Sequence, residues 1–78
     1  SLFTEGLTVL SRVAGRYFAD KTIMDSGIRE KTGCSIIAIK RNEEMIVSPS
    51  PEMTLETDDE LFVIGTIESE RRFLEMKE

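Results

Sequence analysis

Several residue types that carry out chemistry in proteins are scarce or missing in this sequence. The 78 residues include no histidine, which removes the commonest general base and a common zinc ligand. The single cysteine, Cys34, excludes an internal disulfide and fits a reducing compartment. Because Cys34 lies among small and apolar residues, we interpret it as a buried small side chain rather than a nucleophile.

Longer patterns are missing as well. No apolar run is long enough for a membrane span or a signal peptide, and the dinucleotide signature G-x-G-x-x-G does not occur. The net charge is -5 and the basic residues are scattered, so we expect no nucleic-acid interface. With no paired acid and base either, we expect no catalytic residues, no metal and no cofactor, and an enzyme is disfavoured.

The chain is close to the lower size limit for a domain that folds alone. We expect one domain over residues 1–78. Neither end resembles a natural terminus, since Ser1 is not a start methionine, so we expect a fragment of a longer protein. Contact with a second copy or with the rest of that protein would add buried surface.

The first segment with a clear pattern is a strand over residues 7–13. Alternation places Leu7, Val9 and Val13 on one face and Leu10 on the other. Residues 14–21 are predicted to be an irregular connection.

A short helix is predicted over residues 23–31. Thr22 and Asp25 match the [ST]-x-x-[DE] capping pattern, and Gly33 suits the left-handed residue that ends a helix. Asp25 and Arg29 have the spacing of a surface ion pair. Three apolar side chains are expected to face inward: Ile23, Met24 and Ile28.

Residues 34–48 are predicted to form a β-hairpin with a polar break at residues 42–44. The isoleucines of residues 34–41 occupy both faces, which favours a strand that is covered on both sides. Pro49 and Pro51 cannot donate ladder hydrogen bonds and end the hairpin. Residues 48–60 are then expected to connect over the surface.

An acidic run, Asp58-Asp59-Glu60, leads into a further apolar strand over residues 61–64. One interpretation of the run is turn chemistry before a buried strand. Calcium binding is the alternative, but adjacent residues on an extended chain point to opposite sides and EF-hand spacing is missing. Thr66 is expected to cap a last helix from residue 67 to about residue 76, with an apolar stripe of Ile67, Phe73, Leu74 and Met76.

These elements predict an α+β domain with the order strand, helix, hairpin, strand, helix, in which two short helices cover a small sheet. The chain is too short to place helices on both faces of a wide sheet. We therefore expect part of the isoleucine-rich surface to remain open, and an open apolar face on a small domain usually marks an interface.

The ordered set of turn and cap signals resembles the TrkA-C domain, also called RCK-C, the C-terminal lobe of the regulator-of-potassium-conductance module. The resemblance covers roughly residues 7 to 76. It includes Lys21-Thr22, the arginine before Thr32-Gly33, the prolines at 49 and 51, Leu55, and an acidic step into a strand that ends at Gly65-Thr66. The sequence departs from the family at Asp20 and Asp58, where glycine is common. The resemblance implies a tight turn at the acidic run, with Asp58 in the left-handed conformation that the glycine would take.

The resemblance implies a ligand-sensing regulatory domain on the cytoplasmic side of a membrane potassium channel or transporter. Members form homodimers, which implies a dimer interface here at Ile36, Ile37 and Ile39. Some members bind cyclic di-AMP between two lobes, and the matching residues are Ile23, Arg29, Ser35, Ile36 and Pro51. The two isoleucines and the proline would pack against purines, and Arg29 would meet a phosphate. Ser35 stands where nucleotide-binding members have asparagine.

The sequence also allows other interpretations of this domain's function. The same residues could be core or dimer contacts of a purely structural lobe whose ligand site has decayed, with Arg29 paired to Asp25. The chain could also be the sensor lobe of another carrier, such as an antiporter, or of a transcription regulator. The sequence does not identify the attached protein, the ligand or the sign of regulation.

Overall fold

Four strands form one antiparallel sheet in the computed structural model, which describes residues 4–77. The strands are β1 (Leu7–Val13), β2 (Ser35–Arg41), β3 (Glu44–Val47) and β4 (Glu60–Thr66). Their spatial order is β1-β4-β2-β3, so the last strand in the sequence inserts between the first and second. The predicted α+β class and the predicted strands are confirmed.

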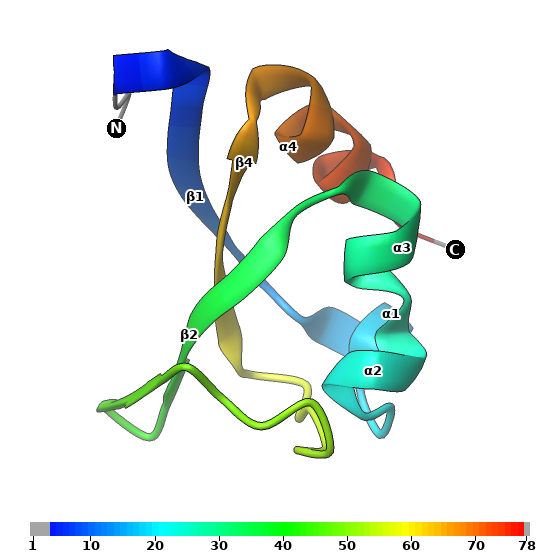
Figure 1. Ribbon diagram of the computed structural model, residues 1–78. Coiled ribbons are helices and arrows are strands. Elements are labelled where there is room, and N and C mark those ends of the chain that lie inside the picture. The colour runs from blue at the N-terminus through cyan, green and yellow to red at the C-terminus, as the bar shows by residue number, and fades with distance from the viewer. Residues whose placement is uncertain (1–3, 78) are drawn as a thin grey trace.

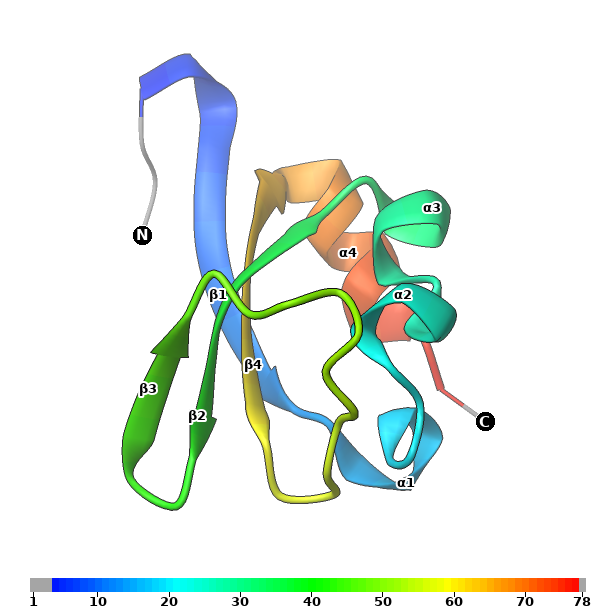
Figure 2. The ribbon, with the colours of Figure 1, turned by 60° about the horizontal axis from the view of Figure 1, so that its bottom comes forward.

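The helices are short. A 3-10 turn, η1 (Thr4–Gly6), precedes β1, and the described chain then contains α1 (Gly15–Phe18), α2 (Ile23–Ser26), α3 (Ile28–Thr32) and α4 (Ile67–Glu75). Figures 1 and 2 show these four helices gathered on one side of the sheet. The prediction that the isoleucine-rich strand is covered on both sides is therefore wrong, whereas the expectation of an open apolar face is confirmed. None of the described helices is long and apolar enough to cross a membrane.

The alternation of β4 explains this one-sided packing. Leu61 and Val63 are fully buried and point toward the helices, whereas Phe62 and Ile64 are only half-buried and point the other way. The core between sheet and helices is built from buried side chains of every layer: Ala14, Phe18, Ile28, Cys34, Ile39, Leu55, Leu61, Val63, Phe73 and Met76.

Arg12 joins β1 to α4 on the helix side of the sheet. Its guanidinium lies 5.0 Å from the ring centre of Phe18 and 5.4 Å from that of Phe73. It also donates hydrogen bonds of 2.9 Å to the carbonyl oxygens of Phe73 and Met76 at the C-terminal end of α4, where the Phe73 carbonyl accepts from the Met76 N–H as well, at 3.2 Å. Burial lowers the pKa of Arg12.

The predicted helix over residues 23–31 is two helices. Gly27, with φ of 71°, breaks the backbone between α2 and α3. The predicted caps are confirmed, because Thr22 Oγ1 accepts from the Asp25 N–H at 3.0 Å and Gly33 ends α3 with φ of 84°. Residues 14–21 are more regular than predicted, since they contain α1.

The orientations expected for this region are partly wrong. Ile28 is buried, but the break lets Met24 turn outward and leaves it 59% exposed. No ion pair joins Asp25 and Arg29 among the described residues, because the two positions belong to different helices. Arg29 is thus free of the surface pairing that its spacing suggested.

The hairpin forms as predicted, with a two-residue turn in which Asn42 and Glu43 both have positive φ. The ladder between β2 and β4 shifts register between Ile36 and Ala38, so that Ile37 is the extra residue of a β-bulge. Ile39 then lies in the core with 0% exposure, which leaves it no free surface for a dimer interface. Ile36 and Ile37 remain partly exposed.

Residues 48–60 were expected to connect over the surface, but two of their side chains are buried. Leu55 is fully buried, and Asp59 is 1% exposed beneath Arg41. Arg41 donates from Nε to Asp59 Oδ1 at 2.8 Å and from Nη2 to Oδ2 at 2.6 Å. The Glu56 N–H also donates to Oδ2, at 2.8 Å, so the acidic run forms a turn, as predicted, and the Asp59 side chain closes it. Because Arg41 holds this carboxylate, the acidic run has a structural role.

The prediction of a left-handed Asp58 is wrong, since this residue is not among those with positive φ. Asp20, the other position where the family favours glycine, does have positive φ, of 70°.

Helix α4 begins as predicted, with Thr66 Oγ1 accepting from the Ser69 N–H at 3.0 Å. Its apolar stripe is narrower than expected. Phe73 and Met76 are buried, but Ile67 and Leu74 are 68% and 52% exposed. Glu70 takes an inward position instead, and Thr8 donates to its carboxylate.

Candidate ligand-binding site

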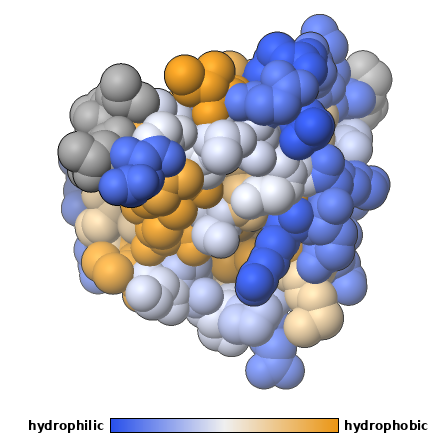
Figure 3. Space-filling view, turned by 45° about the horizontal axis from the view of Figure 1, so that its top comes forward, coloured by the Kyte–Doolittle hydropathy of each residue, from blue (hydrophilic) through white to orange (hydrophobic). Residues whose placement is uncertain are grey.

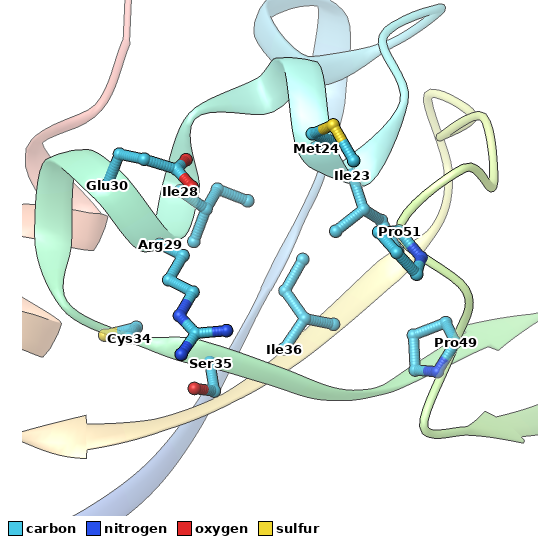
Figure 4. A pocket seen from close by; sticks show the side chains of 10 residues that line it. All are labelled: Ile23, Met24, Ile28, Arg29, Glu30, Cys34, Ser35, Ile36, Pro49 and Pro51. Carbon is cyan, nitrogen blue, oxygen red and sulfur yellow. The ribbon is translucent and has the colours of Figure 1, made fainter.

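A pocket of about 410 Å³ lies between α2, α3, the start of β2 and the segment after β3. This volume is within the range of small-molecule sites. Figure 4 shows the side chains that line it. They are Ile23, Met24, Ile28, Arg29, Glu30, Cys34, Ser35, Ile36, Pro49 and Pro51.

The structure brings all five residues of the predicted ligand site into this one pocket. Arg29 extends from α3 toward Ser35 at the start of β2, and Ile23, Ile36 and Pro51 lie together beside them (Figure 4). One end is thus polar and the other is an apolar wall. The pocket residues come from three separate parts of the sequence, so only the fold places them together.

Backbone hydrogen bonds fix the apolar wall. The Ile23 N–H donates to the Met53 carbonyl at 3.0 Å, and the Met24 N–H donates to the Pro51 carbonyl at 2.9 Å. These bonds satisfy N–H groups that have no partner within the first turn of α2. They also hold Pro51 against the start of α2, and so set the width of the pocket.

Thr32 and Gly33 fix the opposite wall by joining α3 to β2. Thr32 is buried, and its Oγ1 donates to the Ile28 carbonyl at 2.5 Å and accepts from the Cys34 N–H at 3.0 Å. Gly33 has positive φ, and a Cβ there would lie 2.9 Å from Ser69 Oγ. The Thr-Gly pair therefore sets where Arg29 and Ser35 stand relative to each other.

The charges around the pocket are few. Arg29 is the one basic residue of its lining and is exposed, and it has no ion-pair partner in the described part of the chain. Glu30 is the one acidic residue of the lining. Burial raises the pKa of the Cys34 thiol, which disfavours the thiolate needed for a nucleophile. An apolar wall beside a free guanidinium suits a flat, apolar ring system that carries an anionic group.

Sequence reasoning missed half of the lining. Met24 and Ile28 were assigned to the core, Cys34 was interpreted as a buried small side chain, and Pro49 was interpreted only as a strand end. Glu30 was not considered. The signal for Met24 was Gly27, because a glycine inside a short helix indicates the break that turns the preceding residues outward.

The acidic region that raised the calcium alternative lies in a second, polar hollow lined by Arg41, Asn42, Glu56, Thr57, Asp58 and Asp59. Arg41 contacts Glu56 Oε2 at 3.1 Å in addition to Asp59. No group of three or more acidic, histidine or cysteine side chains suited to a metal occurs among residues 4–77. The hydrogen bonds of this region are those of a structural ion pair.

Comparison with protein families matches residues 7–77 to the TrkA-C domain model. The Ktr system potassium uptake protein C of Bacillus subtilis is 39% identical over 70 residues, which cover 90% of this chain and 32% of that protein. Potassium channel protein 1 of Methanocaldococcus jannaschii is 36% identical over 66 residues, covering 81% of this chain and 20% of that protein. The chain thus spans a third or less of these relatives.

Solved structures of RCK domains superpose on this chain. The RCK C domain of the potassium transport protein KtrA in complex with cyclic diadenosine monophosphate superposes with a TM-score of 0.81 at 39% identity, covering 86% of this chain and 79% of that one. The GsuK channel bound to NAD has a TM-score of 0.81 at 39% identity, covering 88% and 13%. The RCK_C domain dimer of S. agalactiae BusR with cyclic di-AMP has a TM-score of 0.75 at 26% identity, covering 87% and 86%.

Proposed function

This chain belongs to the TrkA-C domain family, and from that premise we propose that it is a non-catalytic sensor domain of a potassium channel or transporter. The relatives whose names specify a function are potassium channels and Ktr uptake proteins. In this proposal the 78 residues are one lobe of a longer protein or complex, at the cytoplasmic face of the plasma membrane. Ligand binding would shift the arrangement of two lobes, and that shift would act on the gate.

The ligand we propose is cyclic di-AMP, bound in the pocket around Arg29. The single observation that carries this proposal is the convergence of Ile23, Arg29, Ser35, Ile36 and Pro51 on one pocket. Purine rings would pack on the apolar wall, and the guanidinium of Arg29 would pair with a phosphate. A related KtrA domain and a related BusR domain bind this dinucleotide.

A homodimer follows from the symmetry of that ligand. Cyclic di-AMP has two adenines and two phosphates related by a two-fold axis, and each chain offers one apolar wall and one free arginine at the pocket. Two copies that face each other around the ligand would supply one arginine for each phosphate. Met24, at the rim and 59% exposed, would be buried by the second copy.

The binding residues are tested by isothermal titration of the chain with cyclic di-AMP. Arg29→Ala should lower affinity by about 2 kcal/mol or more, because a charge-assisted contact to each phosphate is lost. Arg16→Ala is the matched control, since Arg16 is also exposed and does not line the pocket. Equal affinity in the two variants would contradict the role of Arg29.

A substitution at Ser35 is expected to raise the affinity for cyclic di-AMP. An asparagine side chain offers both a donor and an acceptor at a greater reach than serine does. We expect Ser35→Asn to tighten cyclic di-AMP binding several-fold while leaving the urea midpoint of the free chain unchanged, since Ser35 is exposed. Weaker binding in this variant would show that position 35 does not face the ligand.

A further inference from the structure

Two sulfur atoms belong to the lining of the ligand pocket, and they differ in their access to solvent. Met24 is 59% exposed, and Figure 4 shows it on α2 above Ile23, at the edge of the apolar wall. Cys34, which follows α3, is 0% exposed. An oxidant in solution can therefore reach the thioether of Met24 far more readily than the thiol of Cys34.

Cys34 is protected from oxidation in two ways. Peroxides react with the thiolate, and burial raises the pKa of the Cys34 thiol, which keeps the sulfur protonated. The sulfur also lies against β4, where a Cβ at position 65 would be only 2.9 Å from Sγ. An oxygen added to Cys34 would have to displace part of the core.

The backbone around Met24 fixes its outward position. Its N–H donates to the Pro51 carbonyl at 2.9 Å, and its carbonyl accepts from the Gly27 N–H at 3.2 Å. Both backbone groups are thus occupied, while the side chain stays in solvent. A thioether has no proton to lose before it reacts with a peroxide, so its reactivity depends mainly on its exposure.

Exposure by itself does not give a methionine a role. Figure 3 shows that other apolar side chains also reach the surface among hydrophilic ones. Met45 on β3 is 51% exposed but does not line the pocket, Met53 is half-buried, and Met76 is 9% exposed. Of the four methionines, Met24 alone combines an exposed thioether with a place in the pocket lining.

From this combination we propose that Met24 is a modification site, oxidised by peroxides to methionine sulfoxide, and that the modification weakens ligand binding. In the reaction the O–O bond of hydrogen peroxide breaks, one oxygen atom bonds to Sδ, and the other leaves as water. The sulfur loses two electrons and the peroxide gains them. A dithiol-dependent sulfoxide reductase reverses the step, since it removes the oxygen as water and is itself oxidised to a disulfide.

The sulfoxide would be poorly accommodated in the bound state. Its oxygen is a strong hydrogen-bond acceptor, but the backbone N–H groups of Ile23 and Met24 already donate to carbonyl oxygens. The guanidinium of Arg29 extends to the other end of the pocket, toward Ser35 (Figure 4). The inference rests on the proposed function, in which a second copy covers this rim. The sulfoxide would then lose its water without gaining a partner.

The same geometry makes ligand binding and oxidation oppose each other. When cyclic di-AMP and the second copy are bound, the thioether of Met24 is covered and is shielded from peroxide. When the pocket is empty, the thioether is exposed and can be oxidised. The domain would thus respond to two signals, the dinucleotide and the oxidant.

Calorimetric titration with cyclic di-AMP, before and after treatment of the 78-residue chain with hydrogen peroxide, tests the effect on binding. Met24→Leu removes the thioether from the rim, and Met45→Leu is the matched control, since it removes a similarly exposed thioether outside the pocket. We expect treatment to lower the affinity of wild type and of Met45→Leu about tenfold or more. Met24→Leu should keep its own untreated affinity.

Sulfoxide reductase should restore the affinity of the treated wild type, and circular dichroism confirms that each treated chain is folded. An equal loss of affinity in Met24→Leu would overturn the proposal. So would full affinity in a wild-type chain that carries the sulfoxide at Met24, as measured by peptide mass spectrometry. No heat from the untreated wild type would overturn the proposed function together with this inference, whereas binding that survives oxidation of Met24 would overturn this inference alone.

Protection by the ligand tests the position of Met24 independently. Peptide mass spectrometry follows sulfoxide formation at Met24 and Met45 with and without saturating cyclic di-AMP. The ligand should slow oxidation at Met24 and leave the rate at Met45 unchanged. The same rate at Met24 in both conditions, in a chain that binds the ligand, would overturn its placement at the covered rim.

Discussion

The substitution Asp59→Asn probes the ion pair that anchors the long connection before β4. The Asp59 carboxylate is 1% exposed and receives two hydrogen bonds from Arg41 and one from the Glu56 N–H. Asparagine keeps the shape but removes the charge, so the exposed Glu56 becomes the one carboxylate paired with Arg41, beside the hydrogen bond from Arg41 to the Thr54 carbonyl. Breaking a buried pair costs about 3 to 5 kcal/mol, and the low end applies because the Arg41 side chain is 23% exposed.

That loss is large for a chain of this size. A 78-residue domain has a free energy of unfolding of roughly 4 to 12 kcal/mol. A loss of about 3 kcal/mol would lower the melting temperature by roughly 15 °C. Urea unfolding followed by circular dichroism measures the change, and Asp58→Asn, which removes the same charge from an exposed neighbour, is the control. If the two variants unfold within about 0.5 kcal/mol of each other, the Asp59 pair does not have the role described here.

The pH dependence of stability gives an independent check of the same pair. Burial alone would raise the pKa of Asp59, but hydrogen bonds from Arg41 and the Glu56 N–H outweigh it and lower that pKa. A carboxylate whose folded pKa lies below the unfolded value of about 3.9 contributes stability above that pH. The contribution is lost as the pH falls through the folded pKa. The stability gap between wild type and Asp59→Asn should therefore be full at pH 6 and shrink below about pH 4.

Three further changes should alter the urea midpoint in stated directions. Arg12→Lys should cost about 2 kcal/mol, because the ammonium cannot stack on Phe73 and bond two carbonyls at once. Gly65→Ala should cost about 1 to 3 kcal/mol, since its Cβ would lie 2.9 Å from Cys34 Sγ in the core. Glu43→Gly should stabilise by about 1 kcal/mol, because residue 43 has φ of 67° in the hairpin turn. A change of the opposite sign in any of the three would contradict the corresponding contact.

The local elements could be predicted because their signals are local. Alternation defined β1 and a short apolar run defined β4, Thr22 and Thr66 form the predicted N-caps, and the two prolines follow the end of β3. The site residues could be placed in one pocket only through the family resemblance. Contacts between α2, β2 and residues 49–51 join segments that are far apart in the sequence, and they produce no periodic pattern in it. The structure supplies the reason, in the backbone bonds that tie α2 to the segment after β3.

The errors arose where tertiary contacts or a single backbone irregularity decided the outcome. Gly27 split one predicted helix into two and turned Met24 outward. The β-bulge at Ile37 changed the alternation along β2 and placed Ile39 in the core instead of at an interface. The partner of Asp59 is Arg41, on a strand 18 positions earlier, so turn chemistry alone could not identify it.

The central claim is that the pocket around Arg29 binds cyclic di-AMP between two copies of this chain. The most direct test is the stoichiometry of binding, measured by calorimetric titration together with sedimentation velocity at saturating ligand. The account predicts one cyclic di-AMP for every two chains, with dimers formed at concentrations where the free chain is monomeric. Absence of binding, or one ligand for each chain on a species that stays monomeric, would contradict it.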